Sequence, residues 1–244
     1  MERISFITSC ALALLLSARA SAQEYKVVIP QVSPATIEVY KKLSTAIIEA
    51  GGAKASIEVV PFARAVYSVE NNTADLLLLA SANPDPAKVA ALKADYSTAD
   101  LFPLVFVLYA NKGKAVDATA LRRGNSENLI VETDSAHVEY FPFKTVGSTS
   151  MDSSLQKLAL GRIDAFVFAQ PSTDAALKRL GIKNVTRQLY GQFMTKVILQ
   201  KGARGGALDK VISAGLEKIK ANGKWDELMQ QYLQGASKYI EWQP

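Results

Sequence analysis

The amino-acid sequence predicts an α/β protein built from two similar lobes. One pattern occurs twice: a helix end, an aspartate, a short apolar strand and a small-polar loop. Asp75 begins the strand of the first copy and Asp164 that of the second, and an alanine closes each strand five positions later (Ala80 and Ala169). Gly161 precedes the second copy and suits a helix end, where a left-handed backbone costs glycine little. Two such units about ninety residues apart favour two lobes, although helix-turn-strand units are common in any α/β protein.

The first part of the chain predicts a parallel sheet. Strands and helices are expected to alternate over residues 26–29, 34–50, 56–60, 62–70 and 75–79. Ser33 is expected to cap the first of these helices. Alternation of helices with strands rich in Val, Ile and Leu is typical of a parallel sheet covered on both faces. Ligands bind beyond the carboxyl ends of such strands, so the loops at 80–83 and 169–172 are expected to face one cleft.

The rest of the chain predicts a passage into a second lobe and a return. An extended loop at 96–103 leads into an apolar strand at 104–110 that leaves the first lobe. Strand-like segments at 185–190 and 195–200 follow, and the second of them returns the chain. The second lobe is expected to begin with a strand at 128–132 and a helix from Asp134 or Ser135 to about Phe141. A brief strand at 144–146 and a helix capped within 148–150 follow, and the aromatic tail at 239–244 is expected to dock on the body.

Residues 1–22 are expected to form a cleaved secretory signal peptide. Arg3 precedes an apolar run, and Ala20-Ser21-Ala22 is a small-x-small cleavage signal. The single cysteine, Cys10, lies inside this segment. The mature chain therefore has no disulfide, no thiolate metal site and no cysteine nucleophile.

Composition and motifs exclude several other functions. The formal net charge is +5, but the basic residues are scattered in pairs, so we expect no nucleic-acid partner. No apolar stretch after the signal is long enough to span a membrane. His137 is the only histidine, which excludes a His-rich zinc site. Because the sequence contains no Gly-rich phosphate loop and no Gly-x-Ser-x-Gly motif, we expect no cofactor, no metal and no serine nucleophile.

Five segments carry a resemblance to a known family. They are residues 60–65, 72–75, 95–97, 161–167 and 216–232. Their order and spacing resemble the bacterial periplasmic solute-binding proteins of the extracellular solute-binding family 3 type. The resemblance covers nearly the whole mature chain and implies the periplasmic-binding-protein type 2 fold. It implies a lobe one at residues 23–109 and 195–244, a lobe two at 110–194, and two crossing strands as the hinge.

Departures from the family pattern bear on the ligand. Amino-acid binders of this family hold the α-carboxylate with an arginine, but the corresponding segment, residues 86–93, contains Lys88 and Lys93 and no arginine. They hold the α-ammonium with an aspartate, where this chain has Ala169 and Gln170. The usual Gly-Ser/Thr anion turn of lobe two is replaced by Asp134-Ser135. Since a buried charge requires a partner, the resemblance implies a ligand other than an ordinary α-amino acid.

Candidate site residues follow from these positions. Arg64, one turn into a helix at a strand end, could hold an anion bidentately or form a surface ion pair. Phe62 could stack on a ligand or join the core. Ser135 could both cap a helix and bind, whereas Asp134 is expected to cap. His137 could bind a ligand or be structural. The remaining candidates are polar or aromatic residues expected along the cleft, as is typical of small-ligand sites: Ser81, Tyr96, Asp100, Thr149, Ser150 and Gln170.

Three functions are consistent with this pattern. The first is a monomeric periplasmic protein that closes two lobes on a small polar molecule for an ABC importer or a sensor. The second is a periplasmic enzyme resembling the cyclohexadienyl dehydratases, with Glu132 as its acid. The third is a sensory module that has no transporter.

Overall fold

The computed structural model describes residues 22–32 and 34–234 of the chain. The expected signal peptide up to residue 21, with Cys10, and the expected cap Ser33 lie outside the described residues, as does the aromatic tail. The strands are β1 (Glu24–Pro30), β2 (Lys54–Val60), β3 (Leu76–Ser81), β4 (Ala94–Asn111), β5 (Val131–Asp134), β6 (Val146–Ser148), β7 (Ala165–Ala169) and β8 (Val185–Gln200). The helices are α1 (Pro34–Ala50), α2 (Phe62–Glu70), α3 (Pro86–Ala91), α4 (Ala118–Arg122), the 3-10 helix η1 (Ser135–Tyr140), α5 (Met151–Ala159), α6 (Gln170–Leu180), α7 (Ala207–Ala221) and α8 (Lys224–Gln234).

The strands form one hydrogen-bonded sheet in the order β2-β1-β3-β8-β4-β7-β5-β6. At one end β1 is parallel to β2 and β3, and at the other end β5 is parallel to β6 and β7. Between these groups, β8 runs antiparallel to β3 and to β4, and β4 runs antiparallel to β7. The sheet therefore consists of two parallel parts joined by two antiparallel strands.

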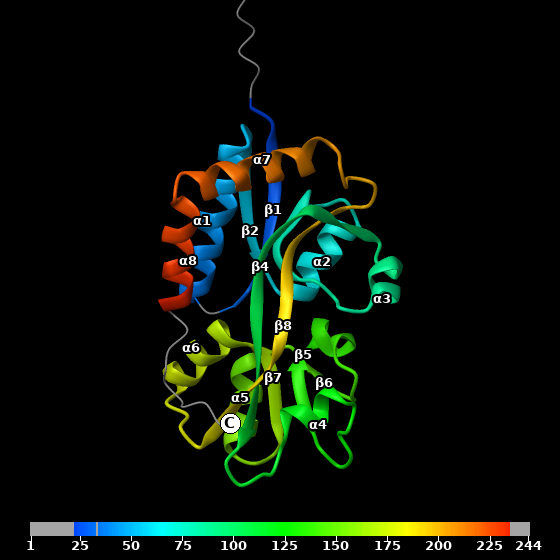
Figure 1. Cartoon of the computed structure of the whole chain (residues 1–244), viewed down its shortest axis with the longest axis vertical. Helices are drawn as coiled ribbons and strands as arrows, with labels where there is room; N and C mark the ends of the chain where they lie inside the picture. The colour runs from blue at the N-terminus through cyan, green and yellow to red at the C-terminus, as the bar shows by residue number, and fades with distance from the viewer. Residues whose placement is uncertain (1–21, 33, 235–244) are drawn as a thin grey trace, which may run out of the picture.

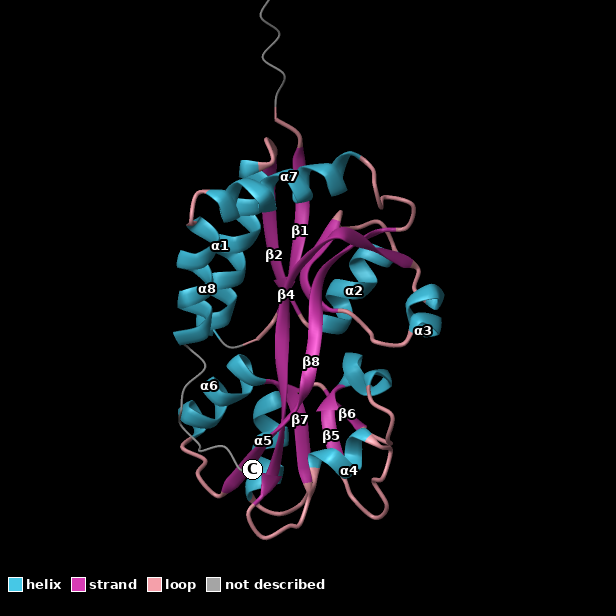
Figure 2. Ribbon diagram, in the orientation of Figure 1, coloured by secondary structure: helices cyan, strands magenta, loops and turns pink. Residues whose placement is uncertain are grey.

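These two parts belong to two lobes (Figure 1). Lobe one contains β1–β3 with α1–α3, α7 and α8, and lobe two contains β5–β7 with η1 and α4–α6. Helices flank the strands in both lobes, and β4 and β8 run through the length of the molecule (Figure 2). The predicted two-lobed α/β fold with two crossing strands is confirmed. The lobe boundaries at 109/110 and 194/195 remain predictions, because β4 and β8 pass between the lobes without interruption.

The repeated sequence pattern corresponds to one repeated hydrogen-bond arrangement. In lobe one, Asp75 Oδ2 accepts from the Lys26 amide at 2.7 Å, and the Asp75 amide donates to the Lys26 carbonyl at 2.9 Å. In lobe two, Asp164 Oδ2 accepts from the Ile130 amide at 2.8 Å, and the Asp164 amide donates to the Ile130 carbonyl at 2.9 Å. Each aspartate therefore joins the start of its strand to the start of the neighbouring parallel strand.

Three predicted elements differ from the structure. The expected loop at 96–103 is part of β4, whose register shifts on either side of Asp100 and thereby accommodates Pro103, which cannot donate a ladder hydrogen bond. The two strands expected at 185–190 and 195–200 are one strand, β8. The helix expected after Asp134 is the short 3-10 helix η1. Within the described residues, no helix has the length and apolar character needed to cross a membrane.

Candidate functional site

A cleft of about 340 Å³ lies between the two lobes and is lined by both. Its lobe-one lining follows β1 and β2 and consists of Pro30, Gln31, Val32, Pro34, Pro61, Phe62 and Ala63. Its lobe-two lining consists of Asp134, Ser135, Thr149, Ser150, Met151, Asp152, Phe168, Ala176 and Arg179. Most of these residues lie at or just beyond the carboxyl ends of parallel strands, which is where open α/β sheets bind ligands.

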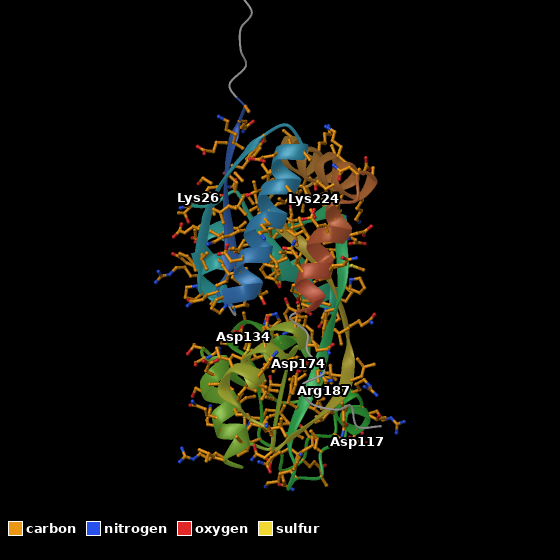
Figure 3. All side chains as sticks on the ribbon, turned by 90° about the vertical axis from the view of Figure 1, so that its left-hand side faces the viewer. Lys26, Asp117, Asp134, Asp174, Arg187 and Lys224 are labelled. Atoms are coloured by element: carbon orange, nitrogen blue, oxygen red, sulfur yellow. The ribbon has the colours of Figure 1, made fainter. Side chains whose placement is uncertain are left out.

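Asp134 connects the cleft to the start of η1. It is the N-cap of that helix, and its Oδ1 accepts from the Ala136 amide at 2.9 Å, which confirms the predicted capping role. His137 Nδ1 lies 3.3 Å from the same oxygen. The Asp134 side chain remains 29% exposed, while the His137 side chain is only 2% exposed. Figure 3 shows Asp134 at the end of lobe two that faces lobe one.

His137 lies in an aromatic cluster behind the cleft and is not one of the residues that line it. Its ring centroid is 4.9 Å from that of Phe62, 4.7 Å from that of Tyr140 and 5.2 Å from that of Phe168. Phe62 belongs to lobe one and the other rings to lobe two, so the cluster spans the lobe interface. The location of His137 favours its structural interpretation over direct ligand binding.

Two further contacts join the lobes beside this cluster. The Tyr140 hydroxyl donates to the Ser81 carbonyl at 2.7 Å, and Lys88 of α3 forms an ion pair with Glu139 of η1. A phenol is protonated at physiological pH and can donate, and burial raises the pKa of Tyr140 further above its usual value. Through these contacts η1 holds lobe two against lobe one.

The cleft brings together four of the residues predicted from sequence: Phe62, Ser135, Thr149 and Ser150. Ser150 also caps α5, because its hydroxyl accepts from the Ser153 amide at 3.3 Å. These four residues come from both lobes, so they remain our candidates for direct ligand contact.

The other predicted residues lie elsewhere. Arg64 is exposed on α2 and does not line the cleft. Asp100 forms an ion pair with Lys196 at 2.5 Å, and the Tyr96 hydroxyl accepts from the Asn83 amide at 3.2 Å. Ser81 is buried. Gln170 Nε2 donates to Asp174 at 3.3 Å and supports lobe two rather than the cleft.

Sequence reasoning missed several lining residues. Gln31 and Phe168 lie at strand ends, so the rule that places ligands there could have found them. Asp152 and Arg179 come from α5 and α6 and form an ion pair at 2.6 Å. Their spacing in the sequence does not predict this ion pair, because the two side chains meet only when α5 packs against α6.

Glu132, the acid of the alternative enzyme hypothesis, is held inside lobe two. Its side chain accepts from the Ser154 hydroxyl at 2.7 Å and forms an ion pair with Lys157. It is 4% exposed and does not line the cleft. Its carboxylate joins β5 to α5, which is a structural role.

A second buried charge pair supports the helix that follows β7. Arg187 of β8 and Asp174 of α6 lie 2.5 Å apart and are 2% and 1% exposed. The Tyr109 hydroxyl of β4 donates to the same carboxylate at 2.7 Å. Burial raises the pKa of Asp174, and the Tyr109 and Arg187 contacts oppose that shift. Figure 3 shows Asp174 and Arg187 inside lobe two.

The described residues contain no group of three or more His, Cys, Asp or Glu side chains that could hold a metal ion.

Comparisons with solved structures identify proteins of the same architecture. A histidine kinase sensor domain with similarity to periplasmic binding proteins matches with a TM-score of 0.68 at 15% identity, over 88% of this chain and 98% of that one. The substrate-binding protein of an amino acid ABC transporter matches with a TM-score of 0.66 at 15% identity, over 86% and 99%. An ancestral amino acid-binding protein, a precursor of cyclohexadienyl dehydratase, matches with a TM-score of 0.62 at 16% identity, over 86% and 94%. The sequence itself matches no protein-family model and no curated protein.

Proposed function

We propose that this chain, which has the two-lobed fold of the periplasmic solute-binding proteins, captures a small polar molecule between its lobes. The observation that carries the proposal is the cleft, whose walls come from both lobes. A ligand that contacts both walls stabilises the conformation in which the lobes are together. An ABC importer or a sensor would respond to that conformation. The chain would act in the periplasm after removal of its signal peptide.

The ligand we propose is not an ordinary α-amino acid. Arg179, the only arginine among the described lining residues, already forms an ion pair with Asp152. Gln170 takes the place that the resemblance gives to an aspartate, and its amide donates to Asp174. An α-carboxylate and an α-ammonium would therefore both lack the partners that the family resemblance implies.

The enzyme alternative has weaker support. Glu132 would have to reach a substrate, but its carboxylate is bonded to Ser154 and Lys157 and is outside the cleft lining. We therefore place a binding function before a dehydratase activity. Incubation with prephenate or arogenate, with decarboxylation as the readout, tests the alternative directly.

Thermal unfolding against a metabolite panel tests the proposed binding function. A ligand present at about 100 times its dissociation constant adds about 2.7 kcal/mol to the free energy of unfolding. We expect one compound to raise the melting temperature, and Phe62→Ala or Thr149→Ala to weaken that effect. Arg64→Ala is the control, because Arg64 lies outside the cleft lining. If no compound shifts melting and none changes the X-ray scattering profile, the proposal is wrong.

A further inference from the structure

The charge of the cleft points to one class of ligand. Among the lining residues that the structure describes, the charged side chains are Asp134, Asp152 and Arg179. Arg179 Nη2 lies 2.6 Å from Asp152 Oδ1, so this pair is neutral as a unit. Arg64, the cation suggested by the sequence, is exposed outside the lining. The net charge presented to a ligand is therefore that of Asp134.

The Asp134 carboxylate has one oxygen engaged and one available. Both recorded contacts, with the Ala136 amide and His137 Nδ1, are made by Oδ1. Among the described residues, no donor reaches Oδ2. No Lys or Arg of these residues lies within ion-pair distance of the carboxylate. A neutral imidazole with its proton on Nδ1 can donate to Oδ1 without neutralising the charge. A carboxylate that is 29% exposed and has no Lys or Arg partner is stabilised when a cation approaches it.

Aromatic rings stand beside this carboxylate. Phe62 from lobe one and Phe168 from lobe two both line the cleft, and both contact the His137 ring that adjoins Asp134. Aromatic faces attract cations through their quadrupole, most strongly where water is excluded. Phe168 and Asp134 also line a second, small pocket, so the two side chains border the same space.

A bare metal ion does not fit this arrangement. The described residues bring no group of three His, Cys, Asp or Glu side chains together, and hard cations require several oxygen ligands. A cleft of about 340 Å³ with both polar and apolar walls suits an organic molecule, since small-ligand pockets have volumes of about 300–1,000 Å³.

We propose that the ligand is a small organic cation without a carboxylate, such as an amine, a guanidine or a quaternary ammonium compound, and that Asp134 recognises its charge. The cationic group lies against Asp134 Oδ2 and beside the cleft-lining rings of Phe62 and Phe168, and the rest of the molecule fills the remaining cleft. This inference rests on the proposed solute-binding function and specifies the substrate class of the same site.

Structurally matched ligand pairs, in which one member carries an added carboxylate, test the inference by calorimetry on the full mature chain. The cations are agmatine, putrescine and choline, and their partners carrying a carboxylate are 4-guanidinobutyrate, 4-aminobutyrate and glycine betaine. Succinate and inorganic phosphate represent anions. We expect at least one cation to bind and its carboxylate partner to bind at least about tenfold more weakly, because a second carboxylate beside Asp134 is repelled.

Asp134→Asn tests the recognising residue. Asparagine is also a good N-cap, so the variant removes the charge and keeps the fold. We expect it to weaken cation binding by about 30-fold or more. Asp117→Asn is the matched control, because Asp117 caps α4 in the same way, accepting from the Thr119 amide at 2.8 Å. Figure 3 shows Asp117 in lobe two, far from the end that carries Asp134, and we expect no change in binding there.

The possible outcomes separate the two proposals. If the tightest ligand is an anion, a zwitterion or a neutral compound, or if Asp134→Asn binds the cation as tightly as the wild type, the charge assignment is wrong and the solute-binding function stands. If no compound of any charge in this set or in the metabolite panel binds, the solute-binding function fails, and the charge assignment fails with it.

Discussion

Asp75 and Asp164 show how a single residue type builds both lobes. Each lies just before an apolar strand and accepts a hydrogen bond from an amide at the start of the adjacent strand, Lys26 in one lobe and Ile130 in the other. Asp164 also forms an ion pair with Lys114 at 2.9 Å, and its side chain is 10% exposed. Its contribution to stability therefore comes from a largely buried, charge-assisted contact.

Replacing Asp164 with alanine should destabilise the protein by about 1–3 kcal/mol, because the Ile130 amide then loses its acceptor. Urea unfolding followed by circular dichroism measures the change. Asp164→Asn is the control and should cost less, since its amide oxygen can still accept. Equal stability of the alanine variant and the wild type would contradict the role assigned to this carboxylate.

Acid should weaken the fold through two carboxylates. Burial alone would raise the pKa of Asp164, but the Ile130 amide and Lys114 outweigh it and hold the pKa below its usual value. Asp95 follows the same pattern, with burial opposed by Lys201 and the Gly202 amide. A lowered folded-state pKa adds stability above the unfolded-state pKa, about 3.9, and that stability is lost as the pH falls through the folded-state value.

We therefore expect the contribution of these two groups to the free energy of unfolding to be constant above about pH 5. Below that pH the contribution should fall progressively. Urea unfolding at a series of pH values measures this dependence. Asp164→Asn should reduce the slope in the acidic range, because it removes one of the two groups. A slope that is unchanged in this variant would show that other carboxylates control acid unfolding.

The sequence predicted which residue types form the site better than it predicted where their side chains lie. Phe62 and Arg64 are two positions apart on one helix, yet Phe62 lines the cleft and Arg64 does not. Two positions on a helix differ by about 200° around its axis. Small differences in how α2 packs on its sheet therefore decide which of them reaches a ligand, and sequence alone does not fix that orientation.

Among the elements, β4, β8 and α6 depend on one buried charge network. Arg187 and Asp174 are both nearly inaccessible to solvent, and Tyr109 completes the contact. Removing one member of such a pair leaves the other charge buried without compensation, which costs about 3–5 kcal/mol.

Arg187→Met should therefore destabilise the protein by about that amount, measured by thermal and urea unfolding. The double variant Arg187→Met with Asp174→Asn should recover part of the loss, because it leaves no charge in the core. Arg123→Met is the control at an exposed arginine. If Arg187→Met and Arg123→Met have the same stability, the buried pair has no structural role.

Element prediction failed where tertiary pairing overrides local signals. The loop expected before Pro103 and the break expected within 185–200 both lie in long strands, because β4 and β8 pair with each other from Ala94–Gln200 to Asn111–Val185. Register shifts absorb the unfavourable residues. The strands β3 and β7, each preceded by an aspartate, were predicted close to their observed positions because their signals are local, whereas the short strands β5 and β6 lie two or three residues later than expected.

At the scale of the whole molecule, η1 carries two contacts that join the lobes. Tyr140 donates to Ser81, and Glu139 pairs with Lys88, so both contacts cross the lobe interface. A buried hydrogen bond contributes about 1 kcal/mol, and the exposed ion pair, which solvent screens, adds less.

The double variant Tyr140→Phe with Glu139→Gln should therefore shift the population towards separated lobes by about fivefold, since every 1.4 kcal/mol is a factor of ten. An increased radius of gyration in small-angle X-ray scattering would report the shift. Glu58→Gln removes an ion pair with Lys26 inside lobe one, 3.1 Å in length, and should leave the radius unchanged. Identical scattering from the double variant and the wild type would show that η1 does not hold the lobes together.

The two-lobed architecture was the most predictable feature, because a repeated pattern and alternating elements recur over the whole chain. The continuity of the sheet was not predictable in the same way. It arises because the long strands β4 and β8 take part in both lobes. Their pairing over this length follows from tertiary packing rather than from the preference of single residues for the strand conformation.

That shared pair of strands has a consequence for how the protein melts. The strands β4 and β8 lie in the middle of the sheet and contribute to both lobes. Neither lobe therefore has a complete sheet without them. Heating should produce a single calorimetric transition whose van't Hoff and calorimetric enthalpies agree, and a fragment ending inside β4 should fail to fold by itself. Any movement that separates the lobes must bend or twist the paired strands β4 and β8. This pairing restricts the lobe movement to a few directions.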